Sequence, residues 1–224
     1  LNRRGYRLAQ GEAPIKETLA ASLIRLANWK GDTPLIDPFC GSGTIAIEAC
    51  LIAQNIAPGF NREFVSEQWN IMPANIYDDY RDEADKMADY DKEIEVYASD
   101  IDPEMVEIAK RNAEEVGLSD IIKFSVKDVN TLTIDTEEPV ALIGNPPYGE
   151  RIGDREEVEE MYRYIGKLMK QHPFLSTYIL TSNKEFEYLV DRKATKRRKL
   201  FNGYIECTYY QYWGKKTERK TIEN

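Results

Sequence analysis

The chain has 224 residues, 42% of them hydrophobic and 31% charged, which fits one globular domain and excludes a mainly disordered protein. No apolar run is long enough to span a bilayer, and the basic residues at the start do not precede the apolar stretch of a signal peptide. The formal net charge of −9 excludes a surface that attracts phosphates everywhere. Three cysteines without CxxC spacing and one histidine offer neither a zinc site nor a disulfide framework. We therefore expect a cytoplasmic protein without a metal ion and without a membrane partner.

Helical and strand patterns alternate along the chain. The expected strands cover residues 34–36, 94–99, 121–126, 140–144 and 174–180, and the expected helices follow Pro14 and cover residues 45–56, 103–116 and 158–169. Such alternation is typical of a mostly parallel sheet that is covered by helices on both faces.

Two segments depart from this alternation. Residues 58–93 are acidic and aromatic at once, and we interpret them as an insertion with short helices of its own. Near the end, residues 194–201 and 204–212 flank Asn202-Gly203, a dipeptide that favours a tight hairpin. The predicted fold is therefore one α/β catalytic domain over residues 1–224. It is Rossmann-like, with a mostly parallel seven-stranded sheet that ends in an antiparallel hairpin, as in class I S-adenosylmethionine-dependent methyltransferases.

The turn after the first expected strand is rich in glycine. Its sequence, Asp37-Pro38-Phe39-Cys40-Gly41-Ser42-Gly43-Thr44, lets a ligand approach the backbone closely. Because Gly41-x-Gly43-x-x-Ala46 also matches the dinucleotide fingerprint, a nicotinamide cofactor stays an alternative at this point. The residues of this turn that we predict to bind the cofactor are Asp37, Phe39, Cys40, Gly41, Gly43 and Thr44.

Acidic residues at the ends of successive strands favour S-adenosylmethionine as the cofactor. Asp37 would repel a pyrophosphate, but its charge suits the ammonium group of a methionine moiety. Asp100 ends the second strand, where its carboxylate can accept both ribose hydroxyls, and Ile101 can pack on the adenine. Asp128 ends the third strand and is placed to accept from the adenine amino group, and we assign its neighbour Val129 to the same site.

The fourth strand leads into Asn145-Pro146-Pro147-Tyr148, which the prolines make a rigid turn at the carboxyl edge of the sheet. The lone pair of a base amino group is delocalised into the ring, so that group must be held in line with the methyl that it accepts. The Asn145 side-chain oxygen and the Pro146 carbonyl can accept its hydrogens, while Tyr148 stacks on the base. We predict that Asn145, Pro146, Pro147 and Tyr148 form the catalytic segment and that Asn145 also borders the cofactor.

With these motifs in place, the chain resembles the catalytic domain of the ribosomal RNA guanine-N2 methyltransferases, RNA methylases that are often fused to a THUMP domain. The resemblance covers nearly the whole chain and is carried by Arg4-Gly5-Tyr6-Arg7, by Ala13-Pro14-Ile15-Lys16-Glu17, and by residues 37–44, 99–103 and 145–151. It implies methylation of the N2 amino group of a guanine in 23S ribosomal RNA. It also implies that the RNA-binding THUMP domain of a longer protein is missing from this chain.

Basic residues near both ends are candidates for RNA contact, although the same residues can form ordinary solvated surface. The residues that we predict to bind RNA are Arg4, Arg7, Arg151, Arg197 and Arg198. The sequence leaves open the identity of the nucleotide and the oligomeric state. Three other functions also stay open: adenine-N6 methylation of DNA or RNA, a catalytically silent module that binds the cofactor or RNA, and a nicotinamide-dependent oxidoreductase.

Overall fold

A seven-stranded sheet forms the centre of the described part of the chain. The computed structural model describes residues 4–7, 15–60, 62–73, 75–148 and 154–215. The strands are β1 (Leu35–Asp37), β2 (Val96–Asp100), β3 (Ile122–Val126), β4 (Val140–Gly144), β5 (Leu175–Thr181), β6 (Lys196–Asn202) and β7 (Ile205–Tyr212), in the order β3-β2-β1-β4-β5-β7-β6. The first five strands of this order pair in parallel, and β7 runs antiparallel to both β5 and β6. The predicted sheet is confirmed.

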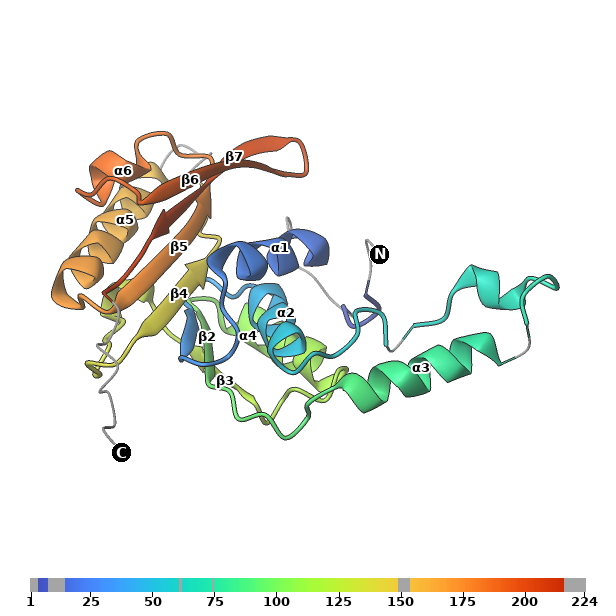
Figure 1. Cartoon of the computed structure of the whole chain (residues 1–224). Coiled ribbons are helices and arrows are strands. Elements are labelled where there is room, and N and C mark those ends of the chain that lie inside the picture. Colours follow the sequence, from blue (N-terminus) through green and yellow to red (C-terminus); the bar gives the residue numbers. More distant parts are fainter. Residues whose placement is uncertain (1–3, 8–14, 61, 74, 149–153, 216–224) are drawn as a thin grey trace, which may run out of the picture.

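Helices cover both faces of the sheet. The helices are α1 (Glu17–Ala27), α2 (Thr44–Ala53), α3 (Ile76–Met87), α4 (Pro103–Glu114), α5 (Asp154–Gln171) and α6 (Phe186–Leu189), with short 3-10 helices η1 (Val65–Gln68) and η2 (Val129–Thr131). Alternate residues of β4 point to opposite faces, as in any strand. Ala141 and Ile143 belong to a core cluster with residues of α1, α2 and α4, and Val140 and Leu142 belong to a second cluster with residues of α5 and α6. Figure 1 shows α5 and α6 on one side of the sheet and α2 and α4 on the other. None of the helices in the described residues has the length and apolarity needed to cross a bilayer.

The hairpin differs in detail from the prediction. Asn202 still pairs with Ile205 in the ladder, so the two-residue loop is Gly203-Tyr204, one residue later than expected. Gly203 has a φ of 64° and takes the first loop position, where glycine is favoured in type II′ turns. The sequence also gave no signal for the four-residue helix α6.

The segment 58–93 lies between α2 and β2 and projects from the body of the molecule as an arm (Figure 1). An ion pair joins Arg81 of α3 to Glu67 of η1, with 2.5 Å between Nη2 and Oε1. The ring of Phe64 also stacks on that of Tyr77, so the two halves of the arm pack on each other. The arm holds four Lys or Arg residues against ten Asp or Glu residues, so its formal net charge is −6.

Candidate functional site

A hollow opens at the carboxyl ends of β1, β2 and β4, where the strand order reverses. Its volume of about 540 Å³ lies within the roughly 300 to 1,000 Å³ that is typical of small-molecule sites. The predicted residues that line it are Phe39, Cys40, Gly41, Thr44, Asp100, Ile101, Asp128, Val129, Asn145, Pro146, Pro147 and Tyr148. Segments that are far apart in the sequence therefore meet at one place.

Gly41 and Gly43 shape the turn between β1 and α2. Their φ angles are 49° and 82°, in the region that side chains other than glycine rarely adopt. A Cβ on Gly41 would meet no atom within 4 Å, whereas a Cβ on Gly43 would lie 3.0 Å from the Cβ of Ala109 in α4. Gly41 thus borders the hollow, while Gly43 serves the turn and the packing of α2 on α4.

Asp37 ends β1 and is fully buried, so it is not among the residues that line the hollow, although Pro38 and Phe39 next to it are. Its Oδ1 accepts the backbone N–H of Phe39 at 3.2 Å, and its buried Oδ2 has no hydrogen-bond partner among the described residues. Burial raises the pKa of Asp37 to about 8, the Phe39 N–H partly offsets this, and the charge of Asp100 adds to the rise. A buried carboxylate oxygen without a partner is the feature that a ligand ammonium group would satisfy. The sequence-based assignment of Asp37 to that group fits this geometry.

The pKa of Asp37 yields a testable prediction. At pH 7 the carboxyl group is mostly protonated, and an ammonium group beside it would favour the ionised form. We expect S-adenosylhomocysteine to bind with release of close to one proton at pH 7, and its affinity to rise with pH between about 6 and 8. Calorimetry in buffers of different ionisation enthalpy measures this release.

Asp37→Asn is the matched control for the calorimetry, because it keeps the shape of the side chain and cannot ionise. The variant should bind with an enthalpy that does not depend on the buffer. If the wild-type protein also showed no buffer dependence, Asp37 would not be the group that receives the ligand's ammonium.

Asp100 joins the glycine turn to the end of β2. Its Oδ2 accepts the N–H of Gly41 at 2.9 Å, and its Oδ1 accepts the N–H of Asp102 at 3.1 Å. Each carboxylate oxygen can accept more than one hydrogen bond, so both can still receive a ribose hydroxyl. Ile101 next to it is 68% exposed at the edge of the hollow. An exposed branched side chain at that place fits a contact with a flat ring such as adenine.

Asp128 has a structural role that is compatible with the one predicted for it. Its Oδ1 accepts the N–H of Asn130 at 2.9 Å and so caps η2. Its Oδ2 makes no hydrogen bond within the part of the chain that the structure describes. Val129 is buried beside it and borders the hollow. Capping fixes the carboxylate at the rim and leaves one oxygen for an amino group.

The catalytic segment is held by one hydrogen bond within it and by hydrogen bonds from β6 and α5. The Tyr148 hydroxyl donates to Asn145 Oδ1 at 2.7 Å, and it lies 3.3 Å from Asn202 Nδ2, which donates to it. Burial raises the pKa of Tyr148, so its hydroxyl keeps its proton. The Tyr162 hydroxyl donates to the Pro147 carbonyl at 3.2 Å. Asn145 Oδ1 therefore has one lone pair occupied and one left for an amino group in the hollow.

Arg4 and Arg7 bind other parts of the protein, although we predicted that they contact RNA. Arg4 Nε lies 2.8 Å from Oε1 of the buried Glu48, and only 9% of Arg4 is exposed. Arg7 Nη2 donates to the Ile15 carbonyl at 2.7 Å and to Thr44 Oγ1 at 2.9 Å. We therefore assign both arginines to the fold. The sequence could not reveal this, because no local pattern shows which other segment of the chain each arginine contacts.

The remaining predicted arginines differ in their positions. Arg197 and Arg198 are exposed on β6, and Arg197 Nη1 lies 3.3 Å from Glu187 Oε2. Arg151 lies outside the described residues, so the structure gives no information on it.

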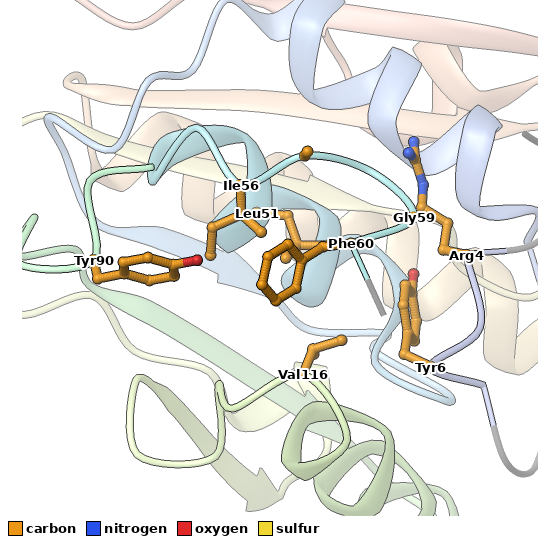
Figure 2. A pocket seen from close by; sticks show the side chains of 9 residues that line it. Arg4, Tyr6, Leu51, Ile56, Gly59, Phe60, Tyr90 and Val116 are labelled. Atoms are coloured by element: carbon orange, nitrogen blue, oxygen red, sulfur yellow. The ribbon is translucent and has the colours of Figure 1, made fainter. Parts of the chain in front are cut away.

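A second hollow lies at the root of the arm, where Figure 2 shows the rings of Tyr6, Phe60 and Tyr90 around Leu51 and Ile56. The Tyr6 hydroxyl donates to Glu48 at 3.0 Å. Burial raises the pKa of Glu48 to about 7, partly offset by Arg4 and by this hydroxyl. The polar groups here thus satisfy each other, and the lining toward the hollow is mostly apolar. We interpret it as packing between the start of the chain and the arm.

Some residues of the first hollow were not found from the sequence. They are Ile15, Pro38, Ser42, Ile45, Lys127, Met161, Asn202 and Ile205. Asn202 and Ile205 reach it because the β6–β7 hairpin turns at the same edge of the sheet as β4 ends. The pairing of β7 with β5 brings this hairpin beside Tyr148. No local sequence pattern indicates which strand β7 pairs with, so the sequence did not predict this contact. Among the described residues, no group of three or more His, Cys, Asp or Glu side chains could hold a metal ion.

Comparison with known sequences identifies several similar proteins. The model of the RMKL-like methyltransferase domain family matches residues 4–211. "Putative RNA methyltransferase YpsC" of Bacillus subtilis is 55% identical in an alignment of 225 positions that covers all of this chain and 58% of that protein. "Ribosomal RNA large subunit methyltransferase K/L" of Shewanella frigidimarina is 41% identical in an alignment of 221 positions that covers 95% of this chain and 30% of that protein. The chain thus spans little more than half of the first relative and less than a third of the second.

Two solved structures superpose closely on this chain and share its fold. SMU.472, described as "a putative methyltransferase complexed with SAH", superposes with a TM-score of 0.90 at 44% identity, over 96% of this chain and 56% of that one. A protein of Listeria monocytogenes, described as "a predicted N6-adenine-specific DNA methylase", superposes with a TM-score of 0.89 at 51% identity, over 96% of this chain and 55% of that one.

Proposed function

The chain belongs to the RMKL-like methyltransferase domain family, and we propose that it transfers the methyl group of S-adenosylmethionine to the N2 amino group of a guanine in large-subunit ribosomal RNA. The observation that carries the proposal is the meeting of Asp100, Asp128 and Asn145 to Tyr148 around one hollow. The names of the relatives YpsC and methyltransferase K/L support RNA as the substrate, and the name of K/L supports RNA of the large ribosomal subunit.

The residues that we assign to the cofactor lie along the carboxyl edge of the sheet. The bound S-adenosylhomocysteine in the structure of SMU.472 supports this cofactor for the hollow. The unpartnered Oδ2 of Asp37 receives the ammonium group, Asp100 holds the ribose hydroxyls, and Asp128 binds the adenine amino group beside Ile101. S-adenosylmethionine supplies an electrophilic methyl group on its sulfur. A nicotinamide cofactor has no support from the family.

The acceptor amino group is bound by the catalytic segment. The free lone pair of Asn145 Oδ1 and the Pro146 carbonyl accept its two hydrogens, which directs the nitrogen lone pair toward the methyl group. These oxygens also stabilise the positive charge that develops as the N–C bond forms. Tyr148 borders the hollow with part of its ring and offers a face for the base. No strong general base is needed, because the nitrogen becomes acidic as it is methylated.

RNA reaches the hollow along a basic face. The exposed Arg198 on β6 contributes to this face, whereas Arg197 lies on the opposite face of the strand and pairs with Glu187. Arg151 follows the catalytic segment in the sequence.

Adenine-N6 methylation is a second candidate, favoured by the description of the relative from Listeria monocytogenes. The amino groups of adenine and guanine are both delocalised into the ring, so Asn145 and Pro146 could hold either one. The two candidates differ in their product and not in their catalytic segment.

Isotope labelling distinguishes the two candidates. The full-length protein would be incubated with S-adenosylmethionine carrying a deuterated methyl group and with ribosomal RNA from a strain that lacks the gene. After digestion, mass spectrometry of the nucleosides is expected to show deuterated N2-methylguanosine. Deuterated N6-methyladenosine instead would select the second candidate, and label in neither nucleoside would refute methylation of ribosomal RNA at these amino groups.

A further inference from the structure

The β6–β7 hairpin is fixed to the catalytic segment. Asn202 ends β6, lines the hollow and donates from Nδ2 to the Tyr148 hydroxyl at 3.3 Å. Cys207 of β7 contacts the same hydroxyl, with 3.5 Å between Sγ and oxygen. Ile205, the first residue of β7, also lines the hollow. These contacts fix the position of the hairpin relative to the site that we propose for the acceptor base.

One face of β6 carries basic side chains that have no carboxylate partner in the part of the chain that the structure describes. Residues of a strand alternate between faces, so Lys196, Arg198 and Asn202 share a face. Arg197 and Lys199 on the other face pair with Glu187 and Glu206, whereas Lys196 and Arg198 form no ion pair within the described residues. At about 3.3 Å per residue, Arg198 lies about 13 Å from Asn202 along the strand. An unpaired cation at this distance suits a phosphate near the hollow.

The tip of the hairpin exposes aromatic side chains. Tyr204 is fully exposed in the loop and makes no hydrogen bond or ring contact with another described residue. Phe201 is 55% exposed at the end of β6. Two-residue loops favour small or polar residues such as Gly, Asn and Asp, and an exposed tyrosine contributes little to folding there. The position of Tyr204 beside the mouth of the hollow is therefore unexplained by the fold.

We propose, on the basis of the proposed function, that this hairpin binds unpaired RNA next to the target nucleotide. Tyr204 stacks on a base that neighbours the target, and Arg198 and Lys196 bind the phosphates of the same strand. A base that enters the hollow must leave its stack, which deprives its neighbour of a stacking partner. An aromatic ring at a fixed distance from Tyr148 replaces that partner, and stacking on a ring needs no particular sequence. The acidic arm repels phosphates, so the hairpin is the favoured side.

Binding of a fluorescein-labelled single-stranded RNA of about 12 nucleotides to the full-length protein tests the proposal without any methyl transfer. Tyr204→Ala is expected to weaken binding about 5- to 150-fold, the change that corresponds to one stacked base. Tyr204→Phe keeps the ring and should bind like the wild-type protein. Arg198→Ala should weaken binding and make the dependence of affinity on salt less steep.

Two controls separate the hairpin from general effects. Tyr80→Ala removes a tyrosine that is 65% exposed on the acidic arm, and it should leave RNA binding unchanged. All variants should bind S-adenosylhomocysteine like the wild-type protein. Wild-type affinity for RNA in both Tyr204→Ala and Arg198→Ala would overturn the proposal for the hairpin and leave the proposed function intact. No binding of RNA by the wild-type protein would contradict both.

Discussion

Replacing Asn145 with alanine is expected to lower the rate of methyl transfer at least about 100-fold, the loss typical of removing a group that stabilises transition-state charge. The affinity for S-adenosylhomocysteine should stay nearly unchanged, because the carboxylates that we assign to the cofactor lie at or after the ends of other strands. The free lone pair of Asn145 Oδ1 is assigned to the acceptor and not to the cofactor. The rate of transfer to RNA under single-turnover conditions, together with calorimetry of S-adenosylhomocysteine binding, measures the two effects separately.

Tyr148→Phe is the matched control for this variant. It keeps the ring that faces the base and removes only the hydroxyl that donates to Asn145 Oδ1. We expect a smaller loss, about 10-fold in kcat, because Asn145 is still present but is less firmly oriented. Turnover by Asn145→Ala at the wild-type rate would remove Asn145 from the catalytic role.

Replacing Asp100 with alanine is expected to weaken binding of S-adenosylhomocysteine by about 1 to 3 kcal/mol, the cost typical of losing charged hydrogen bonds. The structure adds a reason beyond the ribose contact. Asp100 Oδ2 accepts the N–H of Gly41, so the variant also loses a contact that shapes the glycine turn. Calorimetry with S-adenosylhomocysteine measures the change.

Asp102→Ala provides a neighbouring control. Asp102 is exposed two residues further on, and its Oδ1 caps α4 by accepting the N–H of Glu104 at 2.8 Å. Loss of this cap should cost about 1 kcal/mol of stability and leave the cofactor affinity unchanged. The assignment of Asp100 to the ribose fails if Asp100→Ala binds the ligand as tightly as Asp102→Ala does.

The sequence predicted the fold well, because the signals for it are local. Alternating apolar runs located the five parallel strands, and the tight-turn dipeptide Asn202-Gly203 located the hairpin to within one residue. The glycine turn and the catalytic segment both follow strands. Parallel strands bring their carboxyl ends to one edge, so the meeting of these motifs follows from topology alone.

The sequence could not predict contacts that depend on the packing of distant elements. Arg4 looked like a residue for RNA, but the fold places it against Glu48, a charged residue that the pattern of α2 does not mark as buried. Asn202 looked like part of a turn, but it lines the hollow and donates to Tyr148. Gly43 looked like part of the ligand site, but it packs against α4. In each case the partner lies more than one element away along the chain.

We propose that Asn145 and its neighbours hold the N2 amino group of a guanine in large-subunit ribosomal RNA for methylation. The most direct test quantifies N2-methylguanosine by mass spectrometry in 23S ribosomal RNA from three strains. One strain lacks the full-length gene, one is complemented with the wild-type gene, and one is complemented with the gene for Asn145→Ala. We predict that deletion lowers N2-methylguanosine, that the wild-type gene restores it, and that the Asn145→Ala gene does not. An N2-methylguanosine content that is equal in all three strains would contradict the claim.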